Sequence, residues 1–99
     1  MLDEQLIKQI VEKINQELDV DKVMLFGFQV RSDKQISSDI DIAIEGISAV
    51  QAGFIKEILN EDIETLLDFD VLSLDELSNE IIKKRIYKEG MVIYERNVE

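Results

Sequence analysis

An alternating run near the middle of the chain, from Asp39 to Ile44, constrains the fold more than any other stretch of the sequence. Isoleucine occupies every second position, at residues 40, 42 and 44, and the positions between hold Asp39, Asp41 and Ala43. Because strand side chains point alternately to opposite faces of a sheet, the run predicts a strand with one apolar face and both acids on the other. The two aspartates then lie about 6.5–7 Å apart along the backbone, close enough to share a cation.

Three other short stretches predict the remaining strands. Residues 23–26 are wholly apolar, which is typical of a central strand covered on both faces. Residues 66–74 predict a strand in which Asp68 and Asp70 share one face. Residues 91–94, Met-Val-Ile-Tyr, predict a final short strand.

Apolar residues at three- and four-residue spacing predict helices between these strands. The pattern covers residues 2–18 and recurs between residues 47 and 60. Ser73 and Glu76 have the spacing of a capping box that would open a third helix, and Gly90 would end it. The sequence therefore predicts an α/β (α+β) fold in which helices pack on a small mixed β-sheet.

A third acid, Asp70, raises the significance of Asp39 and Asp41. Three converging carboxylates without a counter-ion would cost on the order of several kcal/mol at an effective dielectric near 20, so such a cluster implies a bound metal or raised pKa values. The chain contains no His and no Cys, and a set of oxygen ligands alone favours Mg²⁺ or Mn²⁺. These cations usually complete their shells with water and substrate phosphates, so the implied ligand is a nucleoside triphosphate.

The same acids also have a plainer interpretation. Asp39 would cap its strand, Asp41 would be a solvated strand residue, and Asp70 would be unrelated to both. Asp68 shares a strand face with Asp70 and is an alternative third carboxylate. An Asp-x-Asp motif also holds the diphosphate of sugar nucleotides in glycosyltransferases, but those folds need far more than 99 residues.

Composition narrows the classes of function. The length of 99 residues fits a single domain over residues 1–99. Without His or Cys, disulfides, thiolate nucleophiles, ordinary zinc sites and His-dependent triads are excluded. A net charge of −11 opposes general nucleic-acid binding and suits a basic protein partner. No apolar run approaches the roughly 18–20 residues of a transmembrane helix, and the N-terminus lacks signal-peptide order, so we expect a cytoplasmic protein without membrane contact.

The motifs together resemble the minimal nucleotidyltransferase (MNT) domains of the DNA polymerase beta-like superfamily. The signature of those domains is a Gly-Ser turn that leads to Ser-Asp-x-Asp. Here Gly27 and Arg31 match the turn, residues 38–42 (Ser-Asp-Ile-Asp-Ile) match the acidic strand, and residues 69–72 (Phe-Asp-Val-Leu) match the strand of the third carboxylate. The resemblance extends to residues 89–94 and so covers nearly the whole chain.

The resemblance implies an Mg²⁺-dependent (or Mn²⁺-dependent) transfer of a nucleoside monophosphate, AMP from ATP, to a hydroxyl group. Asp39, Asp41 and Asp70 would be the catalytic and metal-binding residues, with Asp70 also accepting the proton of the acceptor hydroxyl. Two cations in such a site would stabilise the attacking oxygen and the departing pyrophosphate. Nucleotide binding would fall to residues in and after the turn: Gly27, Arg31 and Ser38.

Two positions depart from the family pattern. Phe28 stands where the family has Ser, which removes a hydroxyl donor worth about 1.5–3 kcal/mol towards a charged phosphate. Ser32 stands where a second Gly is common. Phe28 is alternatively a core residue or a stacking platform, and Arg31 is alternatively the partner of Asp33 in a surface ion pair.

Members of this family are commonly paired, as antitoxins, with a small helical toxin of the HEPN type, which implies such a protein as partner and acceptor. A second hypothesis is a catalytically degenerate antitoxin or binding module that neutralises a basic partner by contact, through its −11 charge. A third is an acidic domain that forms homo-oligomers through an exposed sheet edge.

Overall fold

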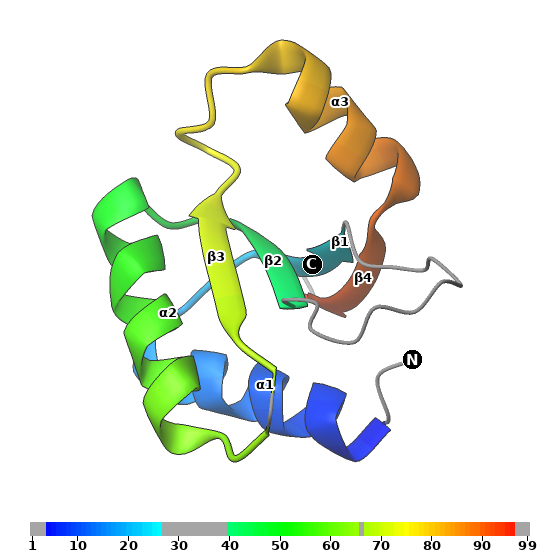
Figure 1. Ribbon diagram of the computed structural model, residues 1–99. Coiled ribbons are helices and arrows are strands. Elements are labelled where there is room, and N and C mark those ends of the chain that lie inside the picture. Colours follow the sequence, from blue (N-terminus) through cyan, green and yellow to red (C-terminus); the bar gives the residue numbers. More distant parts are fainter. Residues whose placement is uncertain (1–3, 27–39, 66, 97–99) are drawn as a thin grey trace.

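A four-stranded mixed sheet, in the order β3-β2-β1-β4, is the frame of the fold (Figure 1). The computed structural model describes residues 4–26, 40–65 and 67–96. Strand β1 pairs antiparallel with β2 and β4, whereas β2 pairs parallel with β3. The predicted mixed sheet is thereby confirmed. In chain order, the elements are α1 (Glu4–Glu17), β1 (Lys22–Phe26), β2 (Ile40–Glu45), α2 (Ala49–Asp62), β3 (Phe69–Ser73), α3 (Glu80–Glu89) and β4 (Met91–Glu95).

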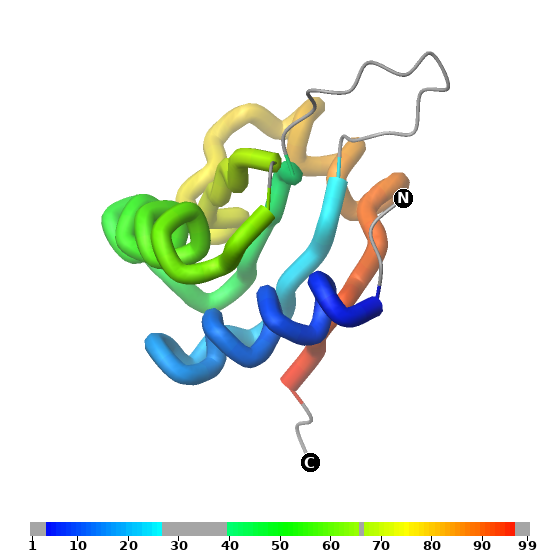
Figure 2. The backbone as a smooth tube through the Cα atoms, turned by 60° about the horizontal axis from the view of Figure 1, so that its bottom comes forward, coloured from blue at the N-terminus to red at the C-terminus, as the bar shows by residue number. Residues whose placement is uncertain are grey.

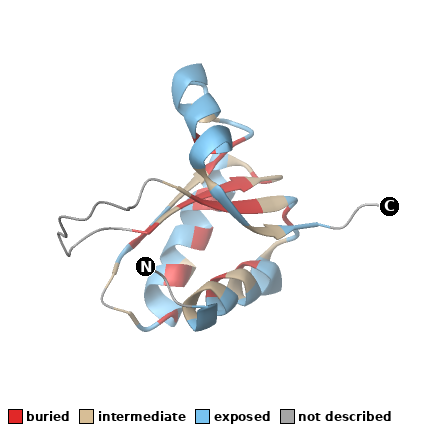
Figure 3. Ribbon diagram, turned by 90° about the vertical axis from the view of Figure 1, so that its right-hand side faces the viewer, coloured by how far each residue is buried: buried red, intermediate tan, exposed pale blue. Residues whose placement is uncertain are grey.

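The helices divide between the two faces of the sheet, as Figure 3 shows with α3 on one side and α1 and α2 on the other. Helices α1 and α2 cover the face to which β2 contributes Ile42 and Ile44, both fully buried, and Figure 2 views the sheet from the side of α1. The opposite face carries a smaller cluster in which Ile86 of α3 contacts Met24 and Ala43. The predicted alternation along β2 is therefore confirmed: its isoleucines lie on the larger core, and Ala43 lies on the other face.

The third helix does not begin where the sequence predicted. Ser73 Oγ does accept a hydrogen bond from the Glu76 backbone N–H (3.2 Å), but the Glu76 carboxylate accepts from the Ala49 N–H (3.0 Å) instead of completing a capping box. Helix α3 begins at Glu80, after the cap residue Asn79. Glu76 thus caps α2, through a contact between two connections that the local spacing of residues does not encode.

A search of the described residues finds no helix with the length and hydropathy of a membrane span.

The connection from β2 to α2 is fastened to the segment that follows β3. Gly46, at φ +98°, donates its N–H to the Asp75 carboxylate (3.2 Å), and a Cβ at this position would lie 2.9 Å from backbone and side-chain atoms of Asp21. Ser73 Oγ donates to the Ile47 carbonyl (2.6 Å). These contacts fix one end of the parallel strand pair, and the positive φ favours glycine at position 46.

Asn60 fixes the other end of that pair. Its Oδ1 accepts from the Phe69 N–H (2.8 Å), and its Nδ2 donates to the Phe69 carbonyl (3.1 Å) and to the Lys56 carbonyl (3.0 Å). The bonds to β2 are made by Asp68, just before β3, and by Leu74, just after it. Because backbone groups of successive residues point to opposite edges of a strand, those of Phe69 point away from β2, at the free edge of β3. The Asn60 side chain therefore substitutes for a further strand at this point of the edge.

Replacing Asn60 with Ala should lower the free energy of unfolding by about 1–2 kcal/mol, because two backbone groups of Phe69 lose their partners. Asn15→Ala is the matched control, since Asn15 also lies two residues from its helix end and donates only to the carbonyl four residues before it. Both changes gain the same helix propensity. Equilibrium denaturation in urea measures the difference, and equal effects of the two variants would contradict the role of Asn60.

Tyr87 attaches α3 to the sheet. Its hydroxyl donates to the Glu45 carboxylate at the end of β2, and the Lys22 ammonium lies 6.0 Å from the centre of its ring. Partial burial, then the hydrogen bond to Glu45 and the negative charges of Glu45 and Asp75, raise the pKa of Tyr87 to about 12. Each of these causes disfavours the phenolate, so the attachment requires the neutral phenol.

The Tyr87 contribution to stability should therefore depend on pH at the alkaline end. The folded pKa lies above the ordinary value of 10.0, so the contribution is complete below about pH 10 and is lost as the pH rises through about 12. Tyr87→Phe should lower the free energy of unfolding by about 0.5–1 kcal/mol near neutral pH. The chain has two tyrosines, so ultraviolet titration of Tyr94→Phe reports Tyr87 alone; a midpoint near 10 would contradict the attachment.

Candidate functional site

The parallel pairing of β2 with β3 places Asp41 directly opposite Asp70. The register is fixed by hydrogen bonds from the Ile40 N–H to the Asp68 carbonyl and from the Leu74 N–H to the Ile44 carbonyl, each 2.8 Å long. Neighbouring strands lie about 4.8 Å apart, and register partners project from the same face of a sheet. The two predicted catalytic carboxylates that the structure describes are therefore side by side.

This pair of acids lies on the face of the sheet that α3 covers only in part. Along their strands, Asp41 and Asp70 alternate with residues of the larger core. The next residues on the same face as the acids are Ala43, which belongs to the smaller cluster beneath α3, and Leu72, which packs against it. Phe26, the last residue of β1, is the antiparallel partner of Asp41 and extends the row across a third strand. Both acids are second in their strands, so the site lies where the chain enters β2 and β3.

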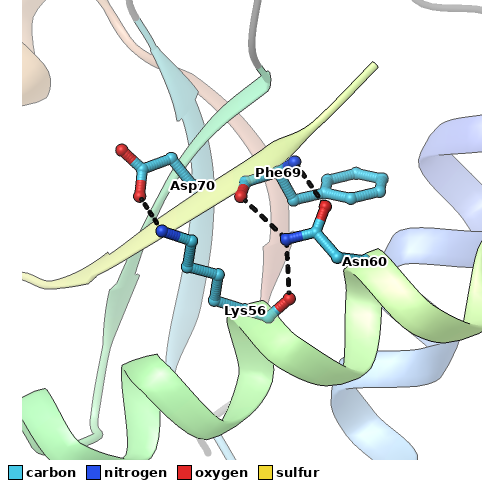
Figure 4. A network of polar contacts seen from close by, with 4 residues as sticks. All are labelled: Lys56, Asn60, Phe69 and Asp70. Carbon is cyan, nitrogen blue, oxygen red and sulfur yellow. Dashed lines mark hydrogen bonds and ion pairs between the residues drawn. The ribbon is translucent and has the colours of Figure 1, made fainter. Parts of the chain in front are cut away.

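The carboxylate of Asp70 is accessible and already has a cationic partner. Its side chain is 58% exposed, and its Oδ1 lies 3.4 Å from Nζ of Lys56 in α2 (Figure 4). Asp41 is half-buried. Sequence reasoning did not identify Lys56, because no motif or spacing links position 56 to position 70; only the packing of α2 beside the edge strand brings them together.

Several predicted site residues lie outside the described part of the chain. These are Asp39 and the three predicted nucleotide-binding residues, Gly27, Arg31 and Ser38, together with Phe28, Ser32 and Asp33. Within residues 4–26, 40–65 and 67–96, no group of three potential metal-ligating side chains gathers. Asp68, the alternative third carboxylate, precedes β3 and is exposed. Of the two candidates, Asp70 is the one in register with Asp41.

The chemistry of Asp41 and Asp70 fits a hard divalent cation. Two carboxylates on one sheet face repel each other, and a cation between them removes that cost. Oxygen ligands suit Mg²⁺ and Mn²⁺, which accept one or two carboxylates and take their other ligands from water or phosphate. The exposed position of Asp70 leaves room for such further ligands.

A family model described as "Polymerase beta, Nucleotidyltransferase" matches residues 8–99. The chain belongs to this nucleotidyltransferase family. The match includes both β2 and β3, so the paired acids lie within the family region. No curated protein gives a significant match to the sequence.

Solved structures share the fold. The toxin-antitoxin complex MntA-HepT has a TM-score of 0.74 and 16% identity, over 95% of this chain and 74% of that chain. A variant of that complex, with two aspartates two positions apart changed to glutamate, has a TM-score of 0.73 and 16% identity, over 91% and 73%. A protein of Sulfolobus solfataricus assigned to the nucleotidyltransferases has a TM-score of 0.54 and 24% identity, over 93% and 79%. The predicted nucleotidyltransferase-like fold is thereby confirmed.

If Asp41 and Asp70 hold one cation, neutralising either should weaken Mn²⁺ binding by at least about tenfold. Asp68→Asn removes the same charge from the same segment and should change the affinity far less, because Asp68 precedes the paired residues. Mn²⁺ titration followed by electron paramagnetic resonance measures the affinities of the wild type and of the three variants, Asp41→Asn, Asp70→Asn and Asp68→Asn. Equal losses in Asp68→Asn and Asp70→Asn would show that net charge, and not the register, governs binding.

Proposed function

We propose that this nucleotidyltransferase-family protein transfers a nucleoside monophosphate, AMP from ATP, to a hydroxyl group in an Mg²⁺-dependent reaction. The observation that carries the proposal is the register of Asp41 with Asp70, within a chain of this family. Two carboxylates on one sheet face, of which Asp70 is accessible, are what a phosphoryl-transfer site needs to hold a cation against phosphate oxygens. Asp39, two positions before Asp41 in the sequence, would complete the set.

In the proposed reaction an oxygen–phosphorus bond forms between the acceptor hydroxyl and the α-phosphorus, while the bond from that phosphorus to pyrophosphate breaks. Bound Mg²⁺ would supply electrostatic stabilisation of the attacking and leaving oxygens. Asp70 would accept the proton of the hydroxyl, since the chain has no His to do so. Its exposure leaves a path for the acceptor to reach it. Gly27, Arg31 and Ser38 would bind the phosphates.

The proposed acceptor is a small helical partner of the HEPN type, with this chain as the antitoxin. The structural similarity to the toxin-antitoxin complex MntA-HepT supports this choice. The Asp-to-Glu variant of that complex changes a pair with the spacing of Asp39 and Asp41 here. A basic partner surface would also be attracted by the net charge of −11. We place the reaction in the cytoplasm and within a single domain over residues 1–99.

A second candidate function is neutralisation of the same partner by contact, without catalysis. Phe28 favours it, because an aromatic ring replaces the hydroxyl that the family presents to the triphosphate. The acidic surface would then cover basic residues of the partner. The two functions differ in whether Asp39 and Asp41 are needed.

Incubating the protein and its co-expressed partner with Mg²⁺ and labelled nucleoside triphosphates should label the partner, with ATP the preferred donor. Asp39→Asn and Asp41→Asn should each lower the rate at least about a hundredfold, because each removes a cation ligand. Asp19→Asn, which removes an equal charge from an exposed position outside the site, should keep the rate. If Mg-ATP does not bind at millimolar concentration while the partner binds tightly, transfer is wrong and contact is favoured.

A further inference from the structure

Lys56 reaches Asp70 from the opposite side of the sheet. The helix that carries it, α2, packs through Ile55 and Leu59 on the larger core, whereas Asp70 alternates away from that core. The two meet because β3 is the edge strand, so a long side chain can pass around it (Figure 4). The long apolar stem of lysine lets its ammonium group cross this edge.

The same helix also holds the backbone next to the carboxylate. Asn60, one helical turn after Lys56, binds both backbone groups of Phe69, the residue before Asp70. Its third hydrogen bond goes to the Lys56 carbonyl. Helix α2 therefore sets the position of the strand through one residue and neutralises the adjacent carboxylate through another.

We propose that Lys56 is a built-in counter-ion of the site, which pairs with Asp70 when no divalent cation is bound and competes with the cation for it. The proposal rests on the cation site of the proposed function. The ammonium lies 3.4 Å from Oδ1 of Asp70, and Asp41 places a second negative charge on the neighbouring strand. A cation that joins these carboxylates must displace the ammonium or bear its repulsion.

The exposure of the two side chains limits how much Lys56 can change the affinity for a cation. Lys56 is 48% exposed and Asp70 is 58% exposed, so the pair is screened and worth at most about 1 kcal/mol, which corresponds to a factor of about five in affinity. Removal of the Lys56 charge should therefore strengthen cation binding, whereas removal of the Asp70 charge should weaken it. Loss of an ordinary stabilising contact would not strengthen binding.

The test compares Mn²⁺ affinities of the full chain and three variants by isothermal titration calorimetry. Lys56→Met keeps the apolar stem and should bind Mn²⁺ about two to five times more tightly than the wild type. Lys56→Arg keeps the charge and should restore the wild-type affinity. Lys13→Met is the control for net charge, because it also removes one positive charge and breaks an α2 ion pair, that of Lys13 with Asp62 (2.9 Å).

Changing the salt concentration distinguishes the effect of the local ion pair on Mn²⁺ affinity from the effect of the net charge. Raising the ionic strength from about 0.05 to about 0.5 M shortens the screening length from roughly 14 to 4 Å. At high salt any gain in Lys13→Met should therefore disappear, whereas part of the gain in Lys56→Met should remain, because the Lys56 ammonium lies only 3.4 Å from the Asp70 carboxylate. A gain of equal size in the two variants, at either salt concentration, would overturn the counter-ion proposal while leaving the cation site intact.

The proposed function fails in a different way. If neither the wild type nor Lys56→Met binds Mn²⁺, the cation site itself is wrong, and Lys56 has nothing with which to compete. If all variants bind Mn²⁺ but none transfers a nucleotide, the counter-ion proposal stands on the affinities and only the transfer reaction is lost.

Discussion

The parallel pairing of β2 with β3 is the constraint on which the site depends. A shift of one residue would turn Asp70 to the larger core and bring Phe69 to the outer face. The pair is therefore fastened at both ends: Asn60 of α2 binds the first residue of β3, and Ser73 binds the connection that follows β2. Fold and site share one set of contacts, so changes far from the acids can displace them.

The second constraint is charge. Two acids in register on one face would destabilise the strand pair if nothing opposed them. In the structure the opposing charge on Asp70 comes from Lys56. A monovalent side chain can relieve part of the repulsion without filling the site, and an exposed ion pair is weak enough to be displaced. The same geometry thus permits a stable fold without a bound cation, and the candidate site would remain ready for one.

The features of the fold that could be predicted are those that depend on residues close together in the sequence. The alternation from Ile40 to Ile44 predicted the strand, its buried face and the outward direction of Asp41, because period-two patterning needs only neighbouring residues. The mixed sheet and the nucleotidyltransferase-like fold were likewise predicted correctly. The capping box from Ser73 to Glu76 was wrong, because the Glu76 carboxylate binds the N-terminus of α2.

The parts that could not be predicted depend on contacts between distant segments. Nothing in the spacing indicated that Lys56 would meet Asp70, or that Asn60 would bind the backbone of Phe69. Both contacts arise because α2 connects the parallel strands β2 and β3 and therefore runs beside β3, the edge strand. The choice between Asp68 and Asp70 could not be predicted for the same reason. The alternation along the strand shows that both share one face, but only the register between β2 and β3 shows that Asp70 is the partner of Asp41. The predicted roles of Gly27 and Asp39 remain predictions.

Charge also links the two ligands of the proposed reaction. With a net charge of −11, the chain repels a free nucleoside triphosphate, which carries about four negative charges, more strongly than its Mg²⁺ complex, which carries about half as many. A divalent cation between Asp41 and Asp70 would reduce that repulsion where the phosphates must approach. Linkage requires the converse, so a bound triphosphate would raise the affinity of the proposed site for the cation. In the proposed reaction the acidic chain would therefore favour the metal complex of the triphosphate over the free triphosphate, and Lys56, by weakening the binding of a cation without substrate, would make cation binding depend more on the substrate.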